Sequence, residues 1–161
     1  MSETAFASIP NSHPPNDDKV LAHVVEYQSA RLNKSPIYKF LLSDAEIYYA
    51  TPGLIVARLT VTANHINAAG GLHGSVTATI VDWAGGLCIA AYDCRQKTGV
   101  SVEINVSYVS VVKVGDVIDI EGKAEKVGSN IAFTTVEIHQ IANNTRKKLV
   151  ASGRHTKFVR S

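Results

Sequence analysis

The chain has 161 residues, of which 45% are hydrophobic and 19% are charged. At about 100 to 200 residues per domain, this length predicts one domain and leaves no room for a second catalytic module. The formal net charge of +2 at pH 7 is too small to make nucleic acid or an anionic membrane surface the main partner. Because the charged fraction lies below the roughly 25% of an average soluble domain, we expect an oligomer that covers apolar surface.

The beginning of the chain predicts a disordered arm without a targeting signal. Residues 1–18 hold three prolines among Ser, Asn and Asp, and this composition buries too little apolar area to offset the entropy of ordering. They contain no Lys or Arg, which secretory and mitochondrial leaders need. Cys88 and Cys94 form no CxxC pair and are expected to be free thiols in a reducing compartment. We therefore expect a cytoplasmic protein, with a mitochondrial location as the alternative, and a single domain over residues 19–161.

The first half of this domain predicts two helices and a hairpin. Asp18 is expected to cap a helix that continues to about Asn33, and Ser35 followed by Pro36 predicts the start of a short second helix. Residues 45–61 are rich in β-branched and aromatic side chains and are interrupted by the sequence TPG. Such a pattern is typical of a β-hairpin.

Residues 74–91 predict a long buried helix, preceded by a loop over residues 64–71. The run GSVTATIVDWAGGLCIAA is too long for one strand, rich in alanine and apolar nearly all round. Over residues 70–92 the only charged side chain is that of Asp82, and the same stretch holds five glycines. A charge and so many glycines make a poor membrane span.

The last third predicts strands. Apolar and polar residues alternate over residues 100–108, and strand-like runs follow over residues 117–125, 131–141 and 148–158. Because turn sequences and no helix separate these runs, we expect sequential neighbours in an antiparallel sheet. One buried helix with such a sheet is an α+β layout.

Asp82 is the first candidate for chemistry. Burying an unpaired carboxylate costs several kcal/mol, so this side chain must be paired, protonated or used. A structural role, hydrogen-bonded to the backbone or to a threonine, fits the sequence. A catalytic role as general base or nucleophile in a partly dry site fits it as well.

The segment that leads into the helix is the second candidate. It ends in His73 and Gly74, and first-turn amides of a helix can polarise a carbonyl or hold an oxyanion. Gly74 and Asp82 are eight residues apart, which on one helix is about 12 Å of axial rise. Both groups must come within about 3 Å of the reacting group. If both act, Asp82 therefore faces the Gly74 of a second subunit.

Three separated motifs resemble the hotdog-fold acyl-CoA thioesterases, in the branch of the animal acyl-coenzyme A thioesterase 13 and the bacterial phenylacetate-pathway thioesterases. They are NAAGGLHGSVTATIVDWAG, GVSVEINVSYV and GRHTKF, and the resemblance covers roughly residues 20–159. It implies a hotdog fold, in which an antiparallel sheet wraps one long helix and two units pair into a continuous sheet. It also implies hydrolysis of fatty or arylacyl-CoA in lipid metabolism, without metal or bound cofactor, by a homodimer or homotetramer with shared active sites.

The resemblance assigns catalytic roles position by position. Asn67 and the amide of Gly74 match the groups that polarise the carbonyl. Asp82 matches the catalytic carboxylate, supplied from the opposite subunit, and Ser101 matches a serine that orients the attacking water. His73 belongs to the turn before the helix, and its role is open between structure and substrate binding.

The terminal motif supplies further candidates for substrate binding. His155 is open between the same two roles as His73. Arg154 and Lys157 are expected to meet the phosphates of coenzyme A. This sequence departs from the family pattern in Ser75, where a second glycine is common, and in the bulky Trp83 beside the carboxylate, which puts the preferred acyl length in doubt.

Two other functions compete with this interpretation. A hotdog enoyl-CoA hydratase or dehydratase pairs a histidine with a carboxylate, and His73 is the residue that such an enzyme would use here. A non-catalytic acyl-CoA-binding module needs no carboxylate in the helix. Six histidines without an HxxxH pattern do not suggest a metal site, and the chain has no GxSxG elbow of a serine hydrolase.

Overall fold

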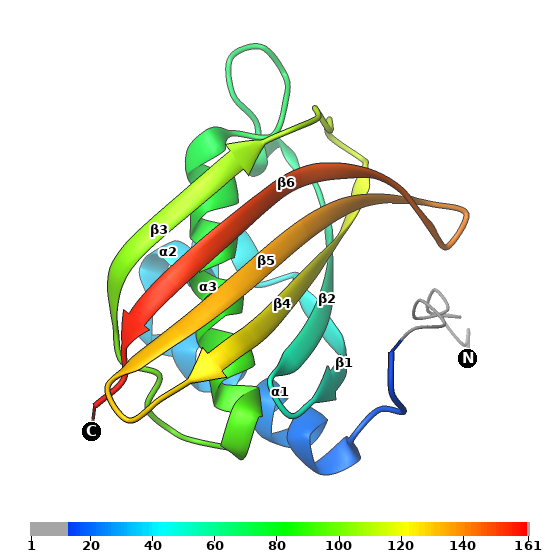
Figure 1. Ribbon diagram of the computed structural model, residues 1–161. Coiled ribbons are helices and arrows are strands. Elements are labelled where there is room, and N and C mark those ends of the chain that lie inside the picture. The colour runs from blue at the N-terminus through cyan, green and yellow to red at the C-terminus, as the bar shows by residue number, and fades with distance from the viewer. Residues whose placement is uncertain (1–12, 161) are drawn as a thin grey trace.

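The computed structural model describes residues 13–160, in which three helices and six strands form the α+β layout that the sequence predicts (Figure 1). The elements in chain order are α1 (Asp18–Lys34), α2 (Pro36–Leu42), β1 (Glu46–Thr51), β2 (Leu54–Thr60), a 3-10 turn (Ala63–His65), α3 (Gly74–Asp93), β3 (Val100–Tyr108), β4 (Val117–Val127), β5 (Ile131–Ala142) and β6 (Thr145–Phe158). The sheet curves around α3, the central helix, so that α3 forms the core of the domain.

The helix boundaries follow from capping side chains. The N-cap of α1 is Asp17, one residue before the predicted Asp18, because the Asp17 carboxylate accepts from the amides of Lys19 and Val20. Ser35 ends α1 and also caps α2, in which Pro36 occupies the first turn as predicted.

The order of the strands corrects one prediction. The sheet is antiparallel throughout with the order β1-β2-β4-β5-β6-β3, so β4, β5 and β6 are sequential neighbours but β3 is not a neighbour of β4. β3 pairs with β6 instead and forms one edge of the sheet. The segment over residues 109–116 carries the chain back to β4 beside β2. β5 and β6 are joined tightly because Asn143 and Asn144 both adopt positive φ, as a two-residue hairpin turn requires.

α3 packs against the sheet at very close range. A Cβ on Gly85 would lie 2.7 Å from Nδ1 of His155, and one on Gly153 would lie 2.6 Å from Cγ2 of Val81. Because Gly85 and Gly153 have no side chain, α3 and the sheet can pack in direct contact at these two positions. By length and composition α3 could cross a membrane, but 67% of its apolar window is buried within the domain, as in a core helix.

The chain before α1 is attached to the domain from residue 13 onward. The Tyr49 hydroxyl donates to the carbonyl of Pro14 at 2.8 Å, and the Ala50 amide donates to the side chain of Asn16 at 2.9 Å. The disordered arm predicted over residues 1–18 therefore does not include residues 13–18, and residues 1–12 lie outside the described residues.

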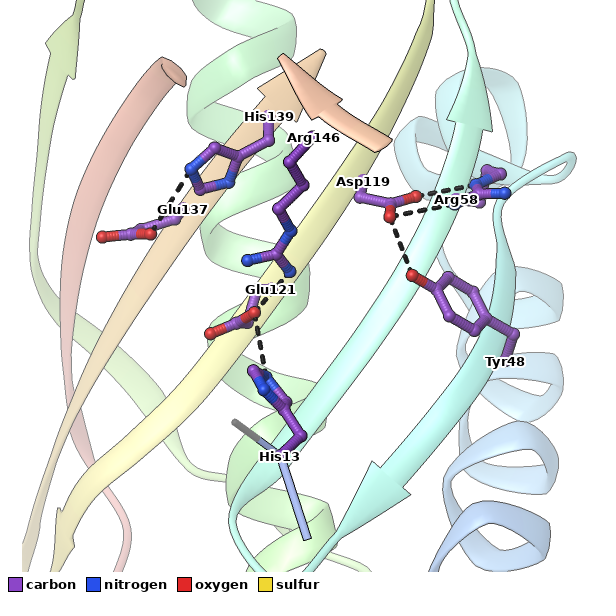
Figure 2. Close-up of polar contacts among 8 residues, drawn as sticks. All are labelled: His13, Tyr48, Arg58, Asp119, Glu121, Glu137, His139 and Arg146. Atoms are coloured by element: carbon purple, nitrogen blue, oxygen red, sulfur yellow. Dashed lines mark hydrogen bonds and ion pairs between the residues drawn. The ribbon is translucent and has the colours of Figure 1, made fainter. Parts of the chain in front are cut away.

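A charged cluster lies on the sheet face that points away from α3 (Figure 2). Asp119 is 2% exposed and accepts from both Arg58 and Tyr48. Beside it, Glu121 accepts from Arg146 and lies 3.1 Å from His13. These contacts join β1, β2, β4, β6 and the loop before α1, and they stabilise the face opposite the core.

Candidate active site

Asp82 lies in the middle of α3 with its side chain 29% exposed, and hydrogen bonds hold both of its oxygens. The Tyr38 hydroxyl, on α2, donates to Oδ2 at 2.5 Å, and Ser101 Oγ, on β3, donates to Oδ1 at 3.2 Å. Burial and the bond to Asp82 raise the pKa of Tyr38, so the phenol stays protonated and remains a donor. The carboxylate is thus paired but not neutralised by a bonded cation.

His155 extends this network behind Ser101. Its Nε2 lies 2.9 Å from Ser101 Oγ and 3.5 Å from Oδ1 of Asp82. Burial, together with the positive charge of Lys157, lowers the pKa of His155 to about 4, which makes the ring neutral at pH 7. Since Ser101 gives its only proton to Asp82, it must accept from the Nε2–H of His155. The imidazole therefore fixes the direction in which the Ser101 hydroxyl points.

A pocket of about 310 Å³ opens beside this carboxylate. Besides Asp82, Ser101 and Tyr38, its lining comprises Tyr27, Arg31, Trp83, Gly86, Leu87, Thr98, Gly99, Val100 and Lys157. Its size suits a small substrate group. Trp83 lines it beside the carboxylate, at the position where an effect on acyl length is expected from the sequence.

Asn67 and Gly74 lie together in a different pocket of about 560 Å³. Oδ1 of Asn67 accepts from the amides of Ala69 and Gly71, which leaves the side-chain NH₂ as the available donor. Gly74 begins α3, and its amide has no partner among residues 13–160. Two N–H donors therefore line one pocket, as a site that polarises a carbonyl requires.

His73 forms the cap of α3. Its Nδ1 accepts from the Ser75 amide at 3.1 Å and lies 2.8 Å from Ser75 Oγ. These contacts give His73 a structural role, and they explain why a serine at position 75 is compatible with the cap.

The predicted site residues fall into two groups and one outlier. Asp82, Ser101, His155 and Lys157 line or adjoin the first pocket, whereas Asn67, His73 and Gly74 lie at the second. Arg154 joins neither group. It is three residues from Lys157 on β6, so its side chain points to the opposite face of the sheet, where it lines other hollows.

Tyr38 is a site residue that was not predicted from the sequence. Its hydroxyl meets Asp82 across 44 residues of sequence. The short helix that carries it was predicted from Ser35 and Pro36, but no local pattern indicates which of its side chains points toward α3.

Comparisons with known proteins agree with this arrangement. A family profile described as Thioesterase superfamily matches residues 69–146, the stretch from the Gly74 loop through β5. Human acyl-coenzyme A thioesterase 13 is 36% identical over 128 residues, which are 80% of this chain and 89% of that protein. The chain belongs to the thioesterase superfamily.

Solved structures of other thioesterases have the same fold. Zebrafish thioesterase superfamily member 2 is 34% identical and superposes with a TM-score of 0.74, covering 91% of this chain and 99% of that one. A hypothetical thioesterase from Streptococcus pneumoniae, solved with coenzyme A, is 25% identical with a TM-score of 0.65 and covers 74% of this chain and 94% of its own. The hotdog fold and the family resemblance noted from three motifs are confirmed.

Proposed function

We propose that this thioesterase hydrolyses acyl-CoA to a free acid and coenzyme A. The observation that carries the proposal is the Asp82 carboxylate, held by Tyr38 and Ser101 at the edge of a pocket. The name of the human relative and the coenzyme A bound to the streptococcal protein support acyl-CoA as the substrate class.

In the proposed mechanism, one subunit holds the thioester carbonyl and the other supplies the base. The Gly74 amide and the Asn67 NH₂ polarise the carbonyl oxygen. Asp82 takes a proton from water while the water oxygen bonds to the carbonyl carbon. The carbon–sulfur bond then breaks, and the thiolate of coenzyme A leaves and is protonated. Ser101, oriented by His155, positions the water beside Oδ1.

The two groups belong to different subunits because one helix separates them. Gly74 and Asp82 lie on the same uninterrupted α3 and line different pockets. Their eight-residue spacing corresponds to about 12 Å along the axis. A single chain therefore holds two half-sites, and a complete site needs a second copy.

The exposed edge strand β3 is the proposed dimer contact. Val100, Val102 and Tyr108 are 66%, 60% and 61% exposed on a strand whose outer backbone groups pair with no other described strand. Such an apolar edge is a template for strand addition. Pairing with the β3 of a second copy covers these side chains and continues the sheet. This pairing accounts for the low charge content. The tetramer, the role in lipid metabolism and the cytoplasmic location remain predictions.

No observation favours the two competing functions. The Nδ1 of His73 is engaged by Ser75, so this ring is not arranged as the base of a hydratase. A binding module has no use for a carboxylate that two hydrogen-bond donors, Tyr38 and Ser101, hold in place.

A thiol-release assay with a panel of acyl-CoAs tests the proposal. We expect turnover with at least one acyl group, and Asp82→Asn is expected to reduce kcat by about 10² to 10⁴. Turnover of no substrate in the panel, or near wild-type activity of Asp82→Asn, contradicts the assignment.

A further inference from the structure

Lys157 is a buried cation in the wall that holds Asp82. It lies on β6 and is only 6% exposed, and it lines the same pocket as the carboxylate. Arg31 is the other cation of this wall, but it is exposed on α1, so solvent and salt screen its charge. Lys157 is therefore the cation that acts on the carboxylate with the least screening.

The position of Lys157 on β6 places it in one cluster with the groups that surround Asp82. Lys157 lies directly opposite Ser101 in the β3–β6 ladder. His155 precedes it by two residues on the same strand, about 7 Å away along the backbone. All three side chains thus leave the sheet on the face toward α3. The cluster lies within one chain, so its geometry does not depend on a second copy.

The charge of Lys157 reaches Asp82 through space and not through a hydrogen bond. The two oxygens of the carboxylate accept from Tyr38 and Ser101. Within residues 13–160, the Nζ of Lys157 forms neither a hydrogen bond nor an ion pair. Burial lowers the pKa of Lys157, and the nearby carboxylate of Asp82 opposes this shift by favouring the ammonium form.

His155 is the other side chain that could supply a positive charge to Asp82. Its Nε2 lies 3.5 Å from Oδ1 of the carboxylate. A protonated ring would form an ion pair there and would occupy the oxygen that the proposed mechanism offers to water. Burial and the charge of Lys157 lower the pKa of His155 to about 4, although Asp82 acts in the opposite direction. The ring is therefore neutral at pH 7.

Two further observations agree with a neutral ring. Nδ1 of His155 is buried without a hydrogen-bond partner in the part of the chain that the structure describes, so a proton on this nitrogen would have no acceptor. The remaining titratable groups around the cluster, besides the exposed Arg31, are uncharged at pH 7, because burial raises the pKa values of Tyr38 and Cys88.

We propose that Lys157 is a positioning residue that supplies the counter-charge of Asp82 from a distance, so that His155 stays neutral and Oδ1 of Asp82 stays open to water. In this role Lys157 touches no substrate and acts through His155 and Asp82. The inference rests on the proposed thioesterase function. It differs from the contact with the phosphates of coenzyme A that was expected for this lysine from the sequence.

The test follows the protonation of His155 and the activity over pH in Lys157→Met, which keeps the apolar stem and removes the charge. NMR titration measures the pKa of the His155 ring, whose resonance is identified by its absence in His155→Gln. Because a neighbouring positive charge is lost, we expect this pKa to rise by about one unit. The acid limb of the kcat profile should move to higher pH by the same amount, with little change at pH 8.

Control variants separate the charge of Lys157 from its packing. Lys157→Arg retains the charge and should keep both the wild-type pKa of His155 and the wild-type acid limb, whereas the uncharged Lys157→Gln should behave like Lys157→Met. Lys126→Met removes an exposed lysine on β4 outside both pockets and should change neither. In a His155→Gln background, Lys157→Met should leave the acid limb in place, because glutamine takes up no proton. A thermal melt shows that each variant is folded.

The possible outcomes distinguish this inference from the proposed function. An unchanged pKa of His155 in folded Lys157→Met and Lys157→Gln overturns the inference and leaves the thioesterase function intact. A higher KM for acyl-CoA with an unmoved acid limb also overturns it, because Lys157 then binds coenzyme A. Absence of turnover with every acyl-CoA overturns the proposed function, whereas the NMR titration still decides whether Lys157 keeps His155 neutral.

Discussion

Tyr38 donates a hydrogen bond of 2.5 Å to Oδ2 of Asp82, and in doing so it joins α2 to the centre of α3. Ser101 holds the other oxygen from the edge strand β3. The carboxylate is therefore fixed from two separate elements, and the plane of its two oxygens is set before a substrate arrives. Such preorganisation is what a base positioned against water requires.

We predict that Tyr38→Phe lowers kcat about tenfold with little change in KM, because one donor that fixes the carboxylate is lost. Steady-state kinetics of thiol release measure both constants. The control is Tyr48→Phe, which removes a comparable bond from Tyr48 to Asp119 on the opposite face of the sheet. This control should lose stability but not kcat. Equal kcat values for Tyr38→Phe and the wild type would exclude a positioning role for Tyr38.

We predict that His155 makes stability depend on pH. Its pKa of about 4 in the folded protein lies below the ordinary histidine value of 6.5, so the unfolded chain binds the proton more readily. The stability from the neutral ring is fully present above pH 6.5 and is lost as pH falls toward 4, by at most about 3 kcal/mol. His155→Gln keeps a donor for Ser101 and cannot be protonated. Urea unfolding at several pH values should show the wild-type advantage over this variant shrinking as pH falls across that window.

Ser129→Ala is the control for that measurement, because Ser129 is exposed and neither side chain titrates over this pH range. Its difference from the wild type should vary little over the same pH range. A wild-type advantage over His155→Gln that is constant from pH 7 to pH 4 would contradict the prediction.

We predict opposite effects for two adjacent glycines of α3. Gly85→Ala places a Cβ 2.7 Å from His155 Nδ1 and 2.9 Å from Thr134 Oγ1, and such overpacking should cost about 1 to 3 kcal/mol. Gly86→Ala meets only Thr98 Oγ1 at 3.6 Å, and better helix propensity should make it neutral or up to about 1 kcal/mol more stable. Chemical denaturation measures the free energy of unfolding of both variants. Equal stability of the two variants would mean that α3 does not press against β6 as described.

The fate of the water oxygen distinguishes the two roles that Asp82 can have, general base or nucleophile. If Asp82 activates water, a single turnover in ¹⁸O-water places the label in the product acid and none in the protein. Mass spectrometry of the product and of the peptide that contains Asp82 reads the result. Label in Asp82 after one turnover would show that the carboxylate itself attacks the carbonyl.

Local patterns predicted most of the fold, because each depends on neighbours in sequence. The period of two in residues 100–108 predicted β3 to the residue, and the long apolar run predicted α3. Which strand β3 joins is decided by how α3 crosses the sheet, a long-range property that turn sequences do not encode. The expected pairing with β4 was wrong for this reason.

The site could be predicted only in part, because some of its contacts also join elements that are far apart in sequence. Asp82 was recognisable as a lone charge in an apolar helix, and its spacing from Gly74 predicted that the two residues do not share one pocket within a chain, which the two separate pockets bear out. Tyr38 gave no comparable signal, because its contact depends on how α2 packs against α3. Arg154 and Lys157 were grouped by closeness in sequence, although strand alternation already places them on opposite faces.

The central claim is that each complete site joins Asp82 of one subunit to Asn67 and Gly74 of another, and complementation between two inactive variants tests it most directly. Asp82→Asn and Asn67→Ala are each expected to be inactive as homodimers. In a heterodimer of the two, purified through different tags, one site combines both substitutions while the other holds wild-type Asp82 and wild-type Asn67. We predict that this heterodimer regains about half of the wild-type activity per dimer. A purified heterodimer as inactive as its parents would show that each site lies within one subunit.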